Sequence, residues 1–183
     1  MELVKSFRSS KIIKYAFIAL IGSIALAISS KIKIPFYPVP MTMQTLVVIV
    51  IGVAFGWKLG LATVSLYLVE GIIGLPVFSG TPEKGVGFVY FTGPTMGYLI
   101  GFLVAVFFAG KFNYNKNLIT NFLKLAFSVG FIYLLGMAWL GSLIGWDKPI
   151  FKLGAQPFLL AELFKVLIVT FLIQKILKIK QSI

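Results

Sequence analysis

The stretch IPFYPVPMTMQ, residues 34–44, lies between two apolar runs and cannot form a helix. Pro35, Pro38 and Pro40 each lack an amide donor, and each holds the preceding residue in an extended conformation. We therefore expect a stiff, extended segment that is short of hydrogen-bond donors. Such a segment can line or cover a pocket.

Other side chains in this stretch support the same interpretation. Phe36 and Tyr37 supply aromatic faces, and Thr42 and Gln44 supply hydrogen-bonding groups where the apolar sequence resumes. The alternative is a proline-rich turn between helices, with its aromatic rings anchored at the level of the lipid headgroups. Composition alone does not choose between the two.

The composition is that of an integral membrane protein. Hydrophobic residues make up 59% of the 183-residue chain and charged residues only 12%, whereas about a quarter of the residues in a soluble domain are charged. We expect an all-α fold with six transmembrane helices and a single membrane-embedded domain over residues 1–183. The six apolar runs cover residues 15–30, 41–56, 59–78, 93–110, 118–146 and 158–173.

Two residue types are absent, and this argues against an enzyme. With no cysteine and no histidine, the chain has no thiolate nucleophile, no imidazole base and few candidate metal ligands. We expect no catalytic residues, no metal and no cofactor. An intramembrane hydrolase would need a serine activated by Lys165, which is the weakest hypothesis.

The net charge of +12 indicates membrane orientation rather than nucleic-acid binding. Basic residues concentrate on cytoplasmic loops, and six spans place both termini on one side. With Lys165 set aside, eleven basic residues fall on the side of the termini and five on the other. We expect cytoplasmic termini and secondary contacts with membrane lipids. The larger group is Lys5, Arg8, Lys11, Lys14, Lys58, Lys111, Lys116, Lys124, Lys175, Lys178 and Lys180; the smaller is Lys31, Lys33, Lys84, Lys148 and Lys152.

Charged residues within apolar runs are functional candidates, because burying a charge in a membrane is unfavourable. Glu162 and Lys165 are three residues apart and share a helical face. For Glu70, and for this pair, the alternative is an ion pair that makes insertion tolerable. Ala19, Ser23 and Ala27 form a small-residue strip, which suits either docking to a partner helix or packing within the chain.

Four motifs occur in the order typical of one known family. They are IPFYPVPMTMQTL, GLPVF at 74–78, GPTMGYLIGF at 93–102 and PFLLAELFK at 157–165. The chain resembles BioY, the biotin-specific substrate-binding subunit, or S component, of energy-coupling factor (ECF) transporters. The resemblance implies a six-helix protein that binds biotin near its outer face. It also implies a transmembrane coupling subunit and two ATPase subunits as partners.

The resemblance also implies binding residues. Gln44 occupies the glutamine of the family's P-V-P-x-T-x-Q motif, and Lys165 the lysine of its last motif, G-D-x-x-K. Glu162 stands where that motif has aspartate, and Ala161 where it has glycine. Met96 replaces the commoner glycine of G-P-T-G-G-Y. The longer Glu162 keeps the acceptor chemistry and changes its reach.

Biotin chemistry agrees with this set of residues. A carboxylate can accept from the two ureido N–H groups, and an ammonium can balance its charge. Aromatic residues can cover the apolar ring; the candidates are Phe36, Tyr37, Phe78, Tyr90 and Tyr98.

The favoured function is high-affinity biotin capture and uptake across a bacterial cytoplasmic membrane, with the strip Ala19, Ser23 and Ala27 docking to the coupling subunit. The alternative is a stand-alone secondary carrier of a small organic solute that uses Glu70, Glu162 and Lys165 as a proton or ion relay.

Overall fold

The fold is that of a computed structural model, which describes residues 2–83 and 85–182. It is all-α apart from two short strands. The long helices are α1 (Glu2–Lys31), α2 (Gln44–Ile72), α4 (Met96–Lys111), α5 (Leu118–Ile144) and α7 (Leu159–Ser182). Short elements connect them: β1 (Lys33–Ile34), β2 (Met41–Thr42), α3 (Phe88–Phe91), α6 (Ile150–Gly154) and the 3₁₀ helix η1 (Gln156–Phe158).

The six predicted helices are present, because α2 contains two of them. Gly56 interrupts α2 with a φ of 72°, a conformation that suits glycine because it has no Cβ. The halves 44–55 and 57–72 then lie side by side, since a Cβ at Gly60 would be 3.7 Å from the Cα of Gly52. The first half is only about 18 Å long. It is therefore too short to cross the hydrocarbon core alone, as the short second run predicts.

Several predicted boundaries need correction. The first and last helices extend well beyond their apolar runs, to Glu2 and Ser182. The third predicted helix, which is the second half of α2, ends at Ile72, six residues before the end of its apolar run. Gly74 follows with a φ of 109°. The loop predicted for residues 79–92 contains the one-turn helix α3.

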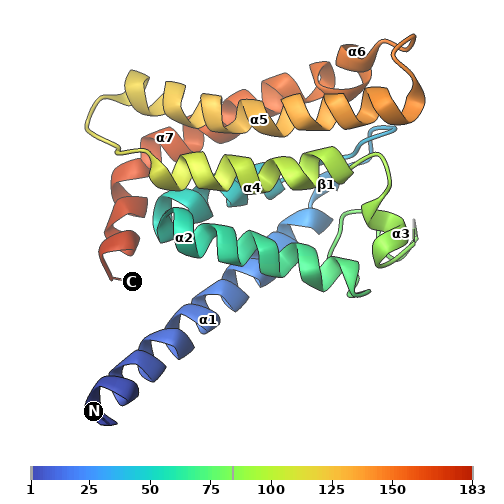
Figure 1. The fold of residues 1–183 in the computed structure, drawn as a ribbon. Helices are drawn as coiled ribbons and strands as arrows, with labels where there is room; N and C mark the ends of the chain where they lie inside the picture. The colour runs from blue at the N-terminus through green and yellow to red at the C-terminus, as the bar shows by residue number, and fades with distance from the viewer. Residues whose placement is uncertain (1, 84, 183) are drawn as a thin grey trace.

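Helix α4 is central and packs against both α2 and α5 (Figure 1). Glycines permit the close approach. A Cβ at Gly101 would lie 2.7 Å from the Cα of Ile132 on α5, and one at Gly110 would lie 2.6 Å from the Cα of Trp57 on α2. Close backbone contact at small residues is a common means of holding membrane helices together.

The proline-rich segment is extended, as predicted. β1 and β2 pair antiparallel through Lys33 with Thr42 and Ile34 with Met41. The segment lies at the same end of the bundle as α3 and α6, and the two termini lie at the other end (Figure 1). The loops predicted to share the outer face therefore gather together. Lys84 lies outside the described residues, as do the side chains of Lys5 and Arg8. Which end of the bundle faces the cytoplasm stays a prediction.

The small-residue strip of α1 faces inward. Ala19 and Ser23 are buried, and Ala27 packs against the main apolar core. The Ser23 hydroxyl donates a hydrogen bond to the Glu70 carboxylate on α2. This corrects the expectation that the strip lies open to a partner, because α2 already covers it. The exposed side of α1 carries larger apolar residues instead, among them Phe17, Ile21, Ile24 and Ile28.

Candidate functional site

A pocket lies among the proline-rich segment, the segment after α2 and the facing sides of α4, α5 and α7. This central pocket holds about 540 Å³ of space free of protein atoms, counting its mouth. Most of the lining is apolar or aromatic, and the polar side chains that line it are Thr42, Gln44, Thr45, Ser79, Thr95 and Glu162, with the phenols of Tyr90, Tyr98 and Tyr133.

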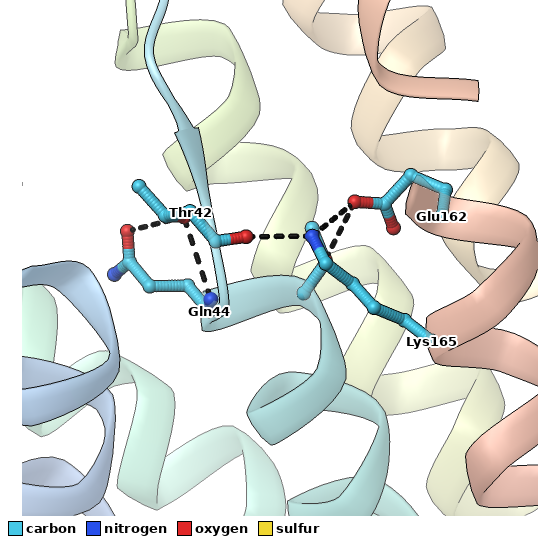
Figure 2. A network of polar contacts seen from close by, with 5 residues as sticks. Thr42, Gln44, Glu162 and Lys165 are labelled. Atoms are coloured by element: carbon cyan, nitrogen blue, oxygen red, sulfur yellow. Dashed lines mark hydrogen bonds and ion pairs between the residues drawn. The ribbon is translucent and has the colours of Figure 1, made fainter. Parts of the chain in front are cut away.

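The predicted pair of Glu162 and Lys165 is buried beside this pocket. Lys165 Nζ lies 2.6 Å from Glu162 Oε1, and the side chains of Lys165 and Glu162 are only 6% and 8% exposed, respectively. The ammonium also donates to the Thr42 carbonyl at 2.6 Å and to the Thr45 hydroxyl at 2.9 Å. Figure 2 shows the ammonium between the end of the proline-rich segment and the Glu162 carboxylate. All three donors of Lys165 thus have partners.

Glu162 is only half satisfied. Its Oε1 accepts from Lys165 and from Thr45, but its Oε2 is buried with no hydrogen-bond partner among the described residues. The Tyr133 phenol lies beside the carboxylate without satisfying this oxygen. A carboxylate oxygen accepts hydrogen bonds and does not donate them. The pocket therefore offers an acceptor, already charge-balanced, to a ligand N–H.

Gln44 connects the pocket to helix α1. Its side chain is 3% exposed, and its Nε2 donates to the Tyr67 hydroxyl at 2.7 Å. The Tyr67 hydroxyl donates in turn to the Val77 carbonyl, which also accepts from Ser30 on α1. Gln44 Oε1 accepts from Thr42 at 3.2 Å and keeps a second lone pair. The amide is thus held in one orientation beside the pocket.

Three of the five predicted aromatic residues line the central pocket. Phe78 stacks on Tyr90 with ring centroids 5.2 Å apart. Tyr98 donates to the Gly154 carbonyl at 2.8 Å, which fixes its ring against the pocket wall. Phe36 and Tyr37 are not part of this wall. Phe36 packs edge-on against Phe158, which does line the pocket, and Tyr37 is 87% exposed.

The 78–81 segment is held over the pocket by contacts from other elements. Lys31 donates to the Phe78 and Thr81 carbonyls, and Lys33 donates to the Ser79 carbonyl at 2.6 Å. The Gly80 amide donates to the Tyr90 hydroxyl. Burial raises the pKa of the Tyr90 phenol, so this group stays neutral at physiological pH.

Sequence reasoning missed Thr45, Ser79, Tyr133 and Phe158. Thr45 follows Gln44 directly, and its proximity to a recognised motif was the available signal. Ser79 is 5% exposed, and its hydroxyl has no hydrogen-bond partner among the described residues. The pocket therefore presents two unpaired polar atoms, Glu162 Oε2 and Ser79 Oγ. A ligand with N–H donors at one end and an acceptor elsewhere complements both.

Comparison with known proteins gives consistent matches along the chain. The model of the BioY family matches residues 4–182. A probable biotin transporter BioY of Pyrococcus horikoshii is 34% identical over 76% of this chain and 81% of its own length. A biotin transporter BioY of Thermotoga maritima is 30% identical over 85% of this chain and 90% of its own.

A solved structure shows the same fold. It is the S-component for biotin from an ECF-type ABC transporter, with a TM-score of 0.76 at 24% identity. The match covers 92% of this chain and 93% of that one. The helices around the central pocket are thus arranged as in that solved structure.

Proposed function

The chain belongs to the BioY family, and from that premise we propose that it captures biotin as the S component of an ECF transporter. The protein is a multi-pass membrane protein of a transporter family. In this role it binds biotin and works as one subunit of a larger assembly in a bacterial cytoplasmic membrane.

The observation that carries the proposal is the unpaired oxygen of Glu162 in a pocket walled by aromatic rings. The ureido group of biotin presents two N–H donors, which match carboxylate acceptors. Its ring and thioether are apolar and suit the stacked Phe78 and Tyr90. In this orientation the acid tail extends toward Ser79, whose hydroxyl can donate to it.

Calorimetric titration of the purified protein with biotin and with desthiobiotin tests the proposal. Both ligands retain the ureido group, so we expect both to bind, and desthiobiotin more weakly because it lacks the sulfur-containing ring. An absence of binding heat with biotin at concentrations well above the protein concentration would refute biotin capture.

Replacing Gln44 by alanine is expected to weaken biotin binding by about 1–3 kcal/mol, the usual effect of removing one partner from buried polar groups. The variant also removes the Nε2 group that donates a hydrogen bond to the Tyr67 hydroxyl. Calorimetry measures the change. Gln156→Ala is the matched control, because Gln156 is exposed at the same end of the molecule. Equal affinities of the two variants would remove Gln44 from the binding site.

Orientation is expected to follow the distribution of basic residues, with the central pocket opening outward and both termini cytoplasmic. The chain has no native cysteine, so single cysteines can be labelled without background. Glu83→Cys should react with an impermeant maleimide on intact cells, and Asn113→Cys, in the loop after α4, only after permeabilisation. The reverse pattern would invert the topology.

Energised uptake, on this proposal, requires a transmembrane coupling subunit and two ATPase subunits. The inward-facing strip of α1 is unsuited to meet them, because Ala19 and Ser23 are buried against α2. Ala19→Trp would therefore disturb the fold as well as any interface. The exposed side of α1, at Ile21 and Ile24, is the better place to test docking.

A further inference from the structure

A second hollow, the outer compartment, adjoins the central pocket beneath the proline-rich segment. It is lined by Lys33 and residues 35–37, together with Pro40, Ser79 and Gly80. Pro40 and Ser79 also line the central pocket, so these two residues form the boundary between the hollows. The outer compartment holds about 410 Å³ counting its mouth.

The Ser79 hydroxyl is available to a ligand atom at this boundary. The residue is 5% exposed, and its hydroxyl has no hydrogen-bond partner among the described residues. Buried hydroxyl groups are normally hydrogen-bonded. A hydroxyl can both donate and accept, so it suits the carbonyl of an amide as well as a carboxylate oxygen.

The outer compartment also carries a positive charge. Lys33 is exposed at its edge, and its ammonium donates one hydrogen bond to the Ser79 carbonyl. An ammonium has three donors, so two remain for a carboxylate. Nearby, the Lys31 ammonium donates hydrogen bonds to the Phe78 and Thr81 carbonyls. Glu83 is the acidic residue that interacts electrostatically with Lys31. The side of the compartment formed by Lys33 therefore favours an anionic group.

Resting on the proposed function, which places the biotin ring in the central pocket, we propose that the outer compartment binds the amino-acid part of biotin amides. The protein then captures conjugates such as ε-N-biotinyl-lysine as well as free biotin. The amide lies at the boundary against Ser79 Oγ. The α-carboxylate of the conjugate lies next to Lys33 and replaces the carboxylate that amide formation removes from the biotin tail, while the α-ammonium of the conjugate leaves its amino-acid part net neutral.

Competition calorimetry with three ligands tests this proposal: free biotin, ε-N-biotinyl-lysine and uncharged biotinamide. The parent protein is expected to bind ε-N-biotinyl-lysine within about tenfold of biotin. Lys33→Gln should weaken the binding of ε-N-biotinyl-lysine by about fivefold, the effect of losing an exposed charge pair. The affinity for biotinamide should stay within about twofold of the parent value, because biotinamide lacks the carboxylate. Lys152→Gln, an exposed lysine of α6 that lines neither hollow, is the matched control.

The outcomes separate this proposal from the proposed function. If biotin itself fails to bind, the proposed function fails. Tight binding of biotin with no competition from a thousandfold excess of ε-N-biotinyl-lysine would leave the proposed function intact and overturn the outer compartment as a conjugate site. Equal losses for ε-N-biotinyl-lysine and biotinamide in Lys33→Gln would overturn the role of Lys33 in it.

Discussion

Glu162→Gln is expected to weaken biotin binding by about 2–4 kcal/mol, one of the largest effects of any single change in the central pocket. The substitution preserves the shape of the side chain and retains an oxygen for Lys165 and Thr45, which both contact Oε1. It replaces the unpaired Oε2 by an amide N–H₂. That donor would face the ureido N–H donors, so an attractive contact becomes a repulsive one.

Two further variants control this experiment. Glu162→Asp restores the residue that the family motif usually carries and keeps a carboxylate, so we expect its affinity to stay within about tenfold of the parent, or about 1.4 kcal/mol. Asp147→Asn removes an exposed carboxylate that pairs with Lys148, and the variant should bind like the parent. Thermal unfolding in detergent verifies folding. A well-folded Glu162→Gln protein with unchanged affinity would contradict the assignment of Glu162 Oε2 to the ligand.

Gly110→Ala is expected to lower the free energy of unfolding by about 3 kcal/mol, at the upper end of overpacking effects. The new Cβ would lie 2.6 Å from the Cα of Trp57 and 2.7 Å from the carbonyl carbon of Gly56. Both are backbone atoms, which cannot rotate away as a side chain can. The glycine turn at Gly56 or the end of α4 would have to move.

Gly130→Ala makes the same chemical change where there is space. Gly130 lies within α5, and a Cβ there meets no atom within 4 Å. Alanine in a helix interior is favoured over glycine by roughly 0.5–1 kcal/mol, so this variant should be neutral or slightly more stable. Denaturation with increasing SDS, followed by circular dichroism, compares the two. Similar unfolding midpoints for both variants would show that the close backbone contact at Gly110 does not make a Cβ at this position destabilising.

The small-residue strip shows where sequence reasoning lacked information. Residues four apart on α1 share a face in any helix, so the pattern correctly predicted a surface of close packing. Whether that surface meets a partner or the chain's own α2 depends on the path of the chain after residue 31. The hydrogen bond from Ser23 to Glu70 joins positions 47 residues apart, and no local pattern specifies such a contact.

The binding candidates divide in the same way. Glu162 and Lys165 stand out as charges in an apolar run, and the resemblance to the family motifs implied that they and Gln44 bind the ligand. The structure places all three at or beside the central pocket. Phe36 and Tyr37 were chosen because they neighbour prolines in a segment expected to cover a pocket. The backbone turns their side chains to the outer compartment instead.

The sequence by itself determined that the chain is a membrane protein of six helical segments, with an extended break between the first two and polar groups at defined points within apolar runs. These features follow from composition and from the local rules of proline and glycine. Only the tertiary structure decided that Thr45 meets Glu162 across 117 residues, that Ser79 joins the pocket, and that α2 folds back at Gly56. Such contacts depend on the packing of whole helices, because each is formed by residues that are remote in the chain and adjacent only once the bundle has closed.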